Sequence, residues 1–486
     1  MSKTVPIQPL LHRVAAALVS SAIAFSSFPQ PTTAQTTSYC RFAPDAIAAK
    51  ENARTASLTG DSNAQQRYQT LVKEHAQALR RCREQTWPKT QAIWLRLYPC
   101  DARSGAMDAL LDHIVNKGYN QIHVEVFYDA KVLLPANNNP TPWVPVVRDR
   151  GAENVDLLAT AIAKGRERGL KVYAWAFAMN FGYGYSLLPN RQQVLARNGK
   201  GENSISYVPD GNQVFIDPYH PQAQRDYQQM VQAIAQRKPD GMLFDYIRYP
   251  RGSGAASVAG RVQDLWIYGD ASRQAILQRA LNSQGRELIA RFLQKGFVSA
   301  NDLQELQKLY PNESGPNWQG RDASIGNTRE VLQGQLWLLS VAHAAQGVLD
   351  FLNRAVGPLQ SNNIPAGAVF FPDGNKGVGQ QGYDSRLQPW DRFPGSIEFH
   401  PMAYTICGSP NCIVEEVRRV LSFAPANAKI MPALAGYWGR RDGNRPSLDE
   451  QMAALRQQVP QINAVSHFAY SWQEPQIDRT RRSCRL

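Results

Sequence analysis

Eight short apolar runs, separated by stretches with helical spacing, constrain the fold of this chain more than any other feature. Short apolar runs that alternate with amphipathic helices are typical of a parallel sheet with crossover helices. Because eight such units can close on themselves, the pattern predicts an α/β fold, a (β/α)8 TIM barrel, over residues 91–475. The runs are residues 92–97, 121–126, 171–177, 241–245, 366–371, 396–402, 429–434 and 466–471.

The length and the intervening segments agree with a barrel. The 486 residues leave room for a barrel of roughly 250 residues with extensions. Hydrophobic residues make up 43% of the chain and charged residues 19%, which is ordinary globular usage. Amphipathic stretches precede several of the runs, at residues 107–117, 155–169, 222–237 and 449–458.

Three segments lie outside the eight units. Residues 35–90 have apolar positions at helical spacing and predict an N-terminal helical extension. Residues 252–325 lengthen the connection between the fourth and fifth runs and predict a helical insertion, followed by a crossover helix at 329–356. Because the insertion leaves from the carboxyl end of the fourth strand, it either shapes the active-site cleft or is a peripheral addition. Residues 476–486 form a C-terminal tail.

Residues 1–34 have the order of a secretory signal peptide. Lys3 and Arg13 precede an apolar run at 14–25, and small residues follow up to Ala34. The run is shorter than the roughly 20 residues of a membrane-spanning helix, which makes an uncleaved anchor the less favoured alternative. We therefore expect a periplasmic or secreted protein with no stable membrane insertion after signal cleavage.

The charge of the chain narrows the range of partners. Cleavage would remove Lys3 and Arg13 and lower the formal net charge from +13 to +11. A basic surface suits an anionic polymer, although a solvated basic face without a partner explains it equally well. The sequence lacks a stripe of Lys and Arg interleaved with aromatic residues, so we expect no nucleic acid as partner.

The six cysteines all follow the signal peptide. An even number of cysteines in an oxidising compartment favours disulfides over free thiols. Of the many possible pairings, Cys407 with Cys412 is the one local prediction, because residues 408–410 form a turn between them. A zinc site is the alternative, but no His or Cys pair has ligand spacing, so we expect neither a metal nor a cofactor.

The sharpest candidate for chemistry is Asp245, which ends the run 241–245. Catalytic groups of (β/α)8 barrels lie where the strands end. Aromatic neighbours such as Tyr246 would desolvate the carboxyl group and raise its pKa toward the range of a general acid, whereas Arg248 would lower it. The structural alternative is that Asp245 only pairs with Arg248 to fix the loop.

Two motifs around this run resemble the glycosyl-hydrolase-like family 10, the domain of unknown function 187 group. They are Phe-Ile-Asp-Pro-Tyr-His-Pro at 215–221 and Phe-Asp-Tyr-Ile-Arg-Tyr-Pro at 244–250. The resemblance extends over about residues 90–475 and is poor across 252–325. It implies a TIM barrel and glycoside hydrolysis, with bacterial cell-wall glycan as a substrate class.

The chain also departs from the family pattern. Many relatives have a second acid where this chain has Tyr246, and a Gln where it has Glu125. The family resemblance by itself does not establish activity.

A second carboxylate is expected, because glycosidases generally use two. Glu125, on the second strand, is favoured, since an acid inside a barrel strand is costly unless it is paired or used. Asp129, Asp373 and Glu474 also follow strands. Alternatively, the 2-acetamido group of the substrate is the nucleophile, and one acid with a positioning Tyr404 suffices.

Further polar and aromatic residues near strand ends are candidates for substrate binding. Flat aromatic rings stack on sugar rings, and such residues suit a carbohydrate cleft. For His220, in the motif at 215–221, a role in holding the loop is favoured over substrate binding. The candidates are Trp175, Tyr246, Arg248, Tyr249, His220, Asp373, Trp438, Trp472 and Glu474.

Together these features predict an exported glycoside hydrolase. It would cleave O-glycosidic bonds of a cell-wall or other extracellular polysaccharide, with a peptidoglycan-type glycan favoured and Asp245 as general acid/base. The main alternative is a non-catalytic carbohydrate-binding barrel. A deacetylase is a weaker third interpretation, because that chemistry usually needs a metal.

Overall fold

The structure is a computed structural model that describes residues 39–484, apart from residues 209 and 381. The expected signal peptide, residues 1–34, lies outside the described residues. Within the described part of the chain, no helix is both long enough and apolar enough to cross a membrane.

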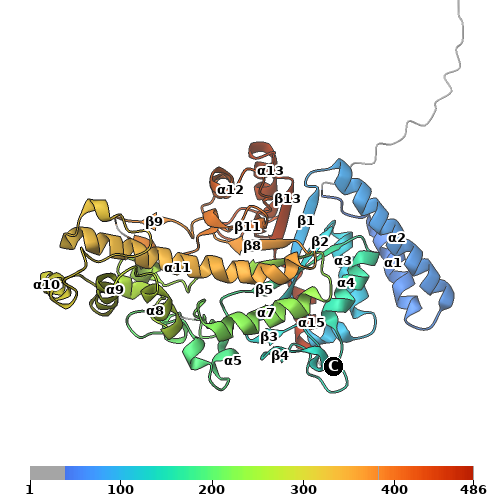
Figure 1. The fold of residues 1–486 in the computed structure, drawn as a ribbon. Coiled ribbons are helices and arrows are strands. Elements are labelled where there is room, and N and C mark those ends of the chain that lie inside the picture. Colours follow the sequence, from blue (N-terminus) through green and yellow to red (C-terminus); the bar gives the residue numbers. More distant parts are fainter. Residues whose placement is uncertain (1–38, 209, 381, 485–486) are drawn as a thin grey trace, which may run out of the picture. The chain divides into compact units, whose positions relative to one another are not determined.

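Eight parallel strands form a closed barrel (Figure 1). Their order is β1-β13-β12-β11-β8-β6-β5-β2, and β1 also pairs with β2, which closes the ring. The predicted (β/α)8 fold with N-terminal helices is therefore confirmed. The strands are β1 (Thr90–Leu95), β2 (Gln121–Tyr128), β5 (Lys171–Phe177), β6 (Gly241–Asp245), β8 (Ala366–Phe370), β11 (Glu398–Ala403), β12 (Ala433–Ala435) and β13 (Ala464–Phe468).

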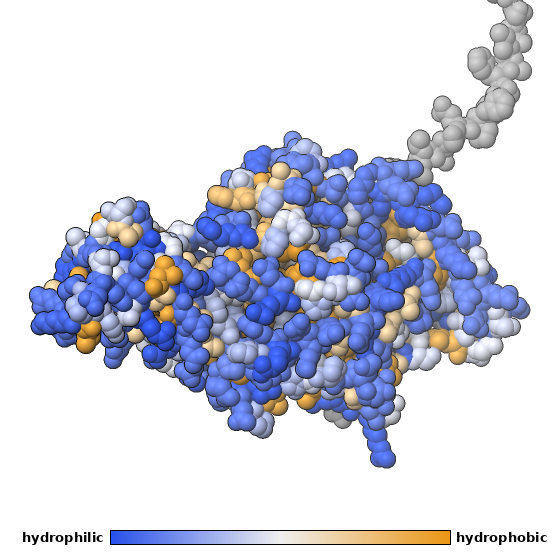
Figure 2. Space-filling model, viewed as in Figure 1, coloured by the Kyte–Doolittle hydropathy of each residue, from blue (hydrophilic) through white to orange (hydrophobic). Residues whose placement is uncertain are grey.

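Helices surround the strands, and the long helix α11 runs beside α7 (Figure 1). Each helix buries one apolar face, as expected of crossover helices on a parallel sheet. On the face seen in Figure 2, hydrophobic residues are scattered among hydrophilic ones. The helices between barrel strands are α3 (Ala106–Asn116), α4 (Leu157–Glu167), α7 (Pro221–Ala235), α11 (Arg329–Gln360), α12 (Asn411–Phe423) and α13 (Leu448–Gln458).

The barrel interior is filled by large side chains opposite glycines. A Cβ atom on Gly241 would lie 2.2 Å from the ring of Tyr173, and one on Gly367 would lie 3.0 Å from the ring of His400. Both glycines therefore make room for an inward-pointing ring. This packing makes the barrel a solid core and leaves its upper end for chemistry.

Two strands differ most from their predicted positions. The seventh, predicted at 429–434, is the three-residue β12, because Pro432 has no N–H to donate to the sheet. The eighth, predicted at 466–471, ends at Phe468, because the aromatic residues after it start the short helix α14 (Tyr470–Gln473).

The long connection after β6 contains three helices, α8 (Asp270–Leu277), α9 (Ser283–Lys295) and α10 (Ala300–Leu309). It also contains β7 (Val258–Ala259). This strand pairs with β10 (Gly382–Asp384), which follows β8 and pairs in turn with β9 (Gly377–Val378). The small sheet joins the loops that follow the fourth and fifth barrel strands.

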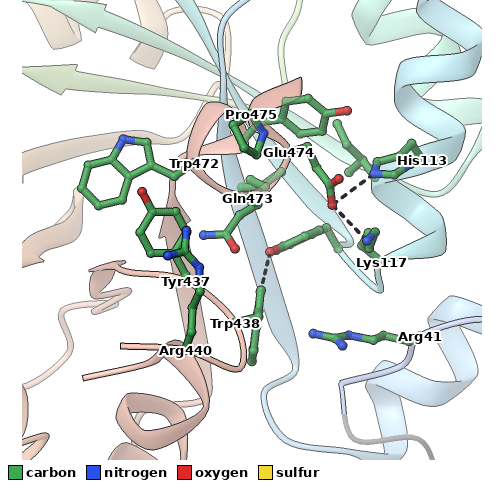
Figure 3. A pocket seen from close by; sticks show the side chains of 14 residues that line it. Arg41, His113, Lys117, Tyr437, Trp438, Arg440, Trp472, Gln473, Glu474 and Pro475 are labelled. Atoms are coloured by element: carbon green, nitrogen blue, oxygen red, sulfur yellow. Dashed lines mark hydrogen bonds and ion pairs between the residues drawn. The ribbon is translucent and has the colours of Figure 1, made fainter. Parts of the chain in front are cut away.

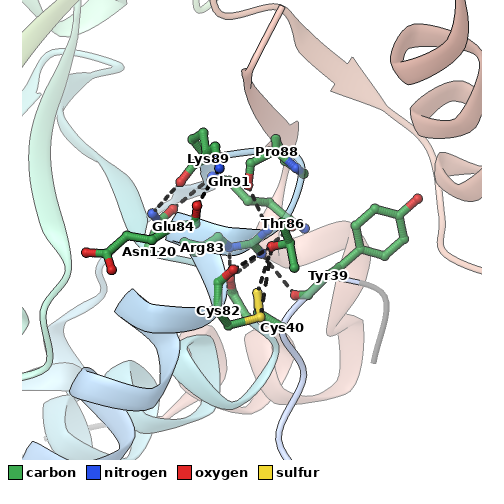
Figure 4. Close-up of a disulfide and its surroundings, with 11 residues drawn as sticks. Tyr39, Cys40, Cys82, Arg83, Glu84, Thr86, Pro88, Lys89, Gln91 and Asn120 are labelled. Atoms are coloured by element: carbon green, nitrogen blue, oxygen red, sulfur yellow. Dashed lines mark hydrogen bonds between the residues drawn. A yellow bond between two sulfur atoms is a disulfide. The ribbon is translucent and has the colours of Figure 1, made fainter. Parts of the chain in front are cut away.

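Two helices precede the barrel, α1 (Pro44–Ser57) and α2 (Ser62–Gln85). Arg83 on α2 is 3% exposed and donates to the carbonyl oxygens of Tyr39 at 2.9 Å, Pro88 at 3.1 Å and Gly118 at 3.1 Å (Figure 4). The disulfide between Cys40 and Cys82 lies beside it. This one guanidinium therefore fastens α2 to the segments on either side of β1.

All six cysteines are paired. The predicted pair Cys407–Cys412 is confirmed, and the other two are Cys40–Cys82 and Cys100–Cys484. Cys484 follows the last helix, α15 (Pro475–Ser483), and Cys100 follows β1. The disulfide Cys100–Cys484 therefore links the segment after the first barrel strand to the segment after the last one, over a sequence separation of 384 residues.

Replacing Cys100 and Cys484 together by Ser should lower the free energy of unfolding by about 2–5 kcal/mol, because the disulfide restricts a very large loop in the unfolded chain. Denaturant unfolding without reductant measures the loss. The control is the double Ser variant of Cys407 and Cys412, whose sequence separation is 5 and whose loss should be smaller. Equal losses in the two variants would contradict this expectation.

Candidate active site

Asp245 is the last residue of β6 and lies at the carboxyl end of the barrel. The side chain of Leu243 lies next to Gly367 inside the barrel. Because side chains alternate along a strand, the side chain of Asp245, two residues later, also points inward. It is 7% exposed. Its carboxylate accepts hydrogen bonds from the backbone N–H of Tyr246 at 2.6 Å and from the indole N–H of Trp175 at 3.2 Å.

This environment favours a protonated carboxyl group. Burial raises the pKa of Asp245 to about 6, while the hydrogen bond from Tyr246, the charge of Arg248 and the Trp175 indole oppose the shift. Among the described residues, no ion pair joins Asp245 to Arg248. Arg248 instead donates to the carbonyl oxygen of Tyr249 at 2.9 Å. These contacts therefore do not agree with the alternative that Asp245 only pairs with Arg248 to fix the loop.

Glu125 lies on β2 and also points into the upper barrel, two residues after the interior His123. Its side chain is 1% exposed and forms an ion pair with Arg96, whose side chain is 36% exposed. Burial raises the pKa of Glu125 to about 7, although the Arg96 guanidinium opposes the shift. One oxygen of Glu125, Oε1, has no hydrogen-bond partner among the described residues.

Glu125 and Asp245 lie on the two strands next to β5, which carries Trp175. Glu125 is the register partner of Trp175 in the β2–β5 pair, and the Trp175 indole donates to Asp245. Besides burial, the negative charge of Asp245 contributes to the raised pKa of Glu125, so Asp245 acts electrostatically on Glu125. The structure thus brings together the two acids that the sequence proposed.

Aromatic side chains surround this pair. The ring of Phe468, at the end of β13, lies 6.2 Å from Trp175, 5.8 Å from Tyr404 and 6.0 Å from Trp472. Burial raises the pKa of the Tyr404 hydroxyl well above its usual range, and the charge of Asp245 adds to this. We call the region where Glu125, Trp175, Asp245, Tyr404 and Phe468 meet the barrel mouth.

Tyr246 and Arg248 form the edge of the barrel mouth. Tyr246 has φ +52°, a left-handed conformation that is strained for a residue with a side chain. Its ring lies 4.4 Å from Phe177 and 4.6 Å from the guanidinium carbon of Arg248. The turn after Asp245 is therefore held in one conformation by stacked groups.

Tyr249 and His220 are two of the substrate-binding candidates that lie away from the barrel mouth. Tyr249 is fully buried, and its hydroxyl donates to the carbonyl oxygen of Ala344 on α11 at 3.3 Å. His220 is the N-cap of α7, and its Nδ1 accepts from the backbone N–H of Gln222 at 3.1 Å. The first residue contributes to packing and the second to helix capping.

Asp217, from the same motif as His220, has a comparable role. It is 1% exposed and accepts from the backbone N–H of Tyr219 and of Ser272 in the first turn of α8, both at 3.0 Å. Burial raises its pKa to about 6 while these hydrogen bonds oppose the shift. The motif at 215–221 therefore joins two helices and contributes no side chain to the barrel mouth.

Asp373 forms an ion pair with the buried Arg386 at 2.9 Å. Trp438 and Glu474 line a cavity of about 230 Å³ that we call the outer-wall cavity, together with Ile93, His113 and Lys117 (Figure 3). Glu474 pairs there with Lys117 at 2.9 Å and with His113 at 3.3 Å. Trp472 also lines this cavity, although it stands near Phe468.

Sequence reasoning missed Arg96 and Phe468. Arg96 follows Ala92 and Trp94 at the spacing of one strand face, so the alternation alone could have placed it inside the barrel. In the sequence, Phe468 could not be distinguished from Tyr470 and Trp472, the aromatic residues of α14 that follow it. Within the described residues, no group of three His, Cys, Asp or Glu side chains is placed to hold a metal ion.

Solved structures with a similar architecture have low sequence identity. The PgaB (BpsB) glycoside hydrolase domain from Bordetella bronchiseptica is 13% identical, with a TM-score of 0.46 over 80% of this chain and 97% of that domain. The catalytic domain of β-amylase from Paenibacillus polymyxa is 10% identical, with a TM-score of 0.46 over 78% and 92% of the two chains.

A search of curated proteins gives no match. The family model described as Glycosyl hydrolase-like 10 matches residues 89–268, which include β1 to β6 and therefore both Glu125 and Asp245. Residues 89–268 are thus similar to the glycosyl hydrolase-like 10 family, and for these residues the resemblance found in the motifs is confirmed.

Proposed function

We propose that this protein is a glycoside hydrolase that cleaves O-glycosidic bonds of a polysaccharide at the barrel mouth, with Asp245 as general acid/base. The observation that carries the proposal is a pair of buried carboxyl groups on the two strands next to β5, both with pKa values raised by burial into the range from about 6 to about 7. Proton transfer at neutral pH is most efficient from groups with such pKa values.

The two carboxyl groups differ in their neighbours. Asp245 receives two neutral N–H donors, whereas Glu125 contacts the charged guanidinium of Arg96, which favours its ionised form. Asp245 would give its proton to the oxygen of the leaving sugar. Glu125 has the higher pKa, about 7 against about 6, so the pair carries one proton over part of this range, and the reactive form is the one in which Asp245 holds it. In that form Glu125 is ionised beside Arg96 and acts as nucleophile or activates water.

Tyr404 supports a second route to the same reaction. Its hydroxyl group stays protonated near Asp245, because burial raises its pKa. If the substrate carries a 2-acetamido group, that group can attack the anomeric carbon while the Tyr404 hydroxyl orients it. A Glu125→Gln variant that retains turnover would favour this route.

The substrate class that we favour is a cell-wall or extracellular polysaccharide of the peptidoglycan type, in the periplasm or outside the cell. Three disulfides suit an oxidising compartment, and the aromatic rings of the barrel mouth suit sugar rings. Incubation with intact and with peptide-stripped peptidoglycan, followed by mass analysis of released fragments, tests this proposal. A non-catalytic carbohydrate-binding barrel would bind the glycan and release nothing.

Asp245→Asn should lower kcat by about 10²- to 10⁴-fold and retain glycan binding, because the amide cannot transfer the proton. Fragment release and binding to insoluble glycan are measured side by side. Asp217→Asn is a matched control, since it changes another buried carboxyl group with a pKa of about 6, outside the barrel mouth. Equal loss of turnover in both variants would argue against a special role for Asp245.

The stability of the protein should also depend on Asp245. Its folded pKa of about 6 exceeds its unfolded value, so the folded chain holds a proton between about pH 4 and pH 6 that the unfolded chain has released. Stability therefore falls as the pH rises through this window. Relative to the native chain, Asp245→Asn should gain about 3 kcal/mol between pH 4 and pH 8.

Denaturant unfolding at the two pH values measures this difference. Asp45→Asn, which removes an exposed carboxylate from the first turn of α1, controls for the loss of one negative charge. A pH-independent difference between Asp245→Asn and the native chain would contradict a raised pKa.

Arg96→Gln should move the pH profile of kcat/KM. Loss of the guanidinium raises the pKa of Glu125 further, so the last proton leaves the carboxyl pair at higher pH. The alkaline limb should shift upward by about one unit, and the maximum should fall because ionised Glu125 becomes rarer. Arg67→Gln on α2 is the control. A lower maximum without any shift would indicate a purely structural role for Arg96.

A further inference from the structure

The outer-wall cavity lies outside the barrel. Its lining includes Ile93, and because Trp94 points into the barrel, its neighbour Ile93 on β1 points out. The other walls come from α3 and from the loops after β12 and β13 (Figure 3). The cavity is therefore separate from the barrel mouth, where the acids point inward.

The cavity lies beside the segment that follows β13. In a regular (β/α)8 barrel, a helix after the eighth strand covers the outer wall beside the first strand. Here the chain forms α14, of four residues, and then α15. α15 is tied to the loop after β1 by the disulfide Cys100–Cys484 and by the ion pair between Arg481 and Asp101 at 2.7 Å. The wall beside β1 is thus left with two short helices.

Aromatic rings line one side of the cavity. Trp438 is half-buried, and its indole N–H donates to the hydroxyl of Tyr119 at 3.3 Å, which fixes the ring (Figure 3). Tyr437 and Trp472 are also half-buried and stack with ring centroids 5.8 Å apart. The guanidinium group of Arg440 lies over the ring of Tyr437 at 3.9 Å, and that of Arg41 lies over the ring of Trp438 at 5.0 Å. This wall therefore combines fixed aromatic rings with guanidinium groups, which suits a sugar residue that carries a negative charge.

The charges of the lining are mostly positive. Arg41, Lys117 and Arg440 line the cavity together with a single carboxylate, that of Glu474. Although burial opposes it, the contacts with His113 and Lys117 hold the pKa of Glu474 at about 2, so this carboxylate stays ionised. Three cations against one anion favour a negatively charged ligand.

We propose that the outer-wall cavity is a second carbohydrate-binding site, which takes one carboxylated sugar residue. The aromatic wall suits the sugar ring, and the excess of cations suits its carboxylate. The volume of about 230 Å³ is below the roughly 300 Å³ at which sites for drug-sized ligands begin, which fits a single sugar residue. Binding here requires no hydrolysis at the barrel mouth, so the two proposals can fail separately.

The test uses the full chain labelled with 5-fluorotryptophan, which gives fluorine NMR signals for its ten tryptophans. Trp438→Phe identifies the signal of Trp438 by its absence. D-glucuronate, D-glucose and acetate are titrated as probes. We expect D-glucuronate to shift the Trp438 signal with a millimolar Kd, and the other two probes to shift it much less.

The outcomes separate the parts of the proposal. A Trp438 signal that D-glucuronate leaves unmoved overturns it. An equal shift with D-glucose removes the role of the carboxylate, and an equal shift with acetate leaves an anion site only, so both results also overturn it. Arg440→Ser should weaken D-glucuronate binding by about tenfold, whereas Arg67→Ser, an exposed change on α2, should leave the Kd unchanged.

Discussion

The desolvation of Glu125 and Asp245 at the carboxyl end of the barrel is the constraint on which the rest of the site depends. In a packed parallel barrel, inward positions at the carboxyl end have neighbours on all sides and little water. A carboxyl group there must be neutral or receive hydrogen bonds or an opposite charge. Asp245 receives two N–H donors and Glu125 receives Arg96, and the aromatic residues around them keep both pKa values high.

Much of this arrangement could be predicted from the sequence, because it follows from periodicity. The apolar runs identified the strands, and two of them, 171–177 and 241–245, match β5 and β6 residue for residue. Asp245 could be placed because it ends a run whose carboxyl end must face the open side of the barrel. Glu125 could be placed because it lies within a strand.

The rest of the site depends on contacts that periodicity does not encode. The pairing of Arg96 with Glu125 depends on the register between β1 and β2. Trp438 and Glu474 follow the seventh and eighth strands, yet both line the outer-wall cavity. The path of the chain after the eighth strand is set by the short helix α14 and by the disulfide that connects α15 to the loop after β1. Asp217 caps a helix whose Ser272 lies 55 residues further along the chain, a distance that no local pattern covers.

The pairing of β1 with both β2 and β13 sets the order in which the molecule can be completed. Synthesis proceeds from the N-terminus, so one edge of the first strand stays open until nearly the whole chain exists. Contacts between such distant segments are slow to form. In the folded protein the disulfide between Cys100 and Cys484 covalently joins the segments that follow β1 and β13, the two strands of this last pair.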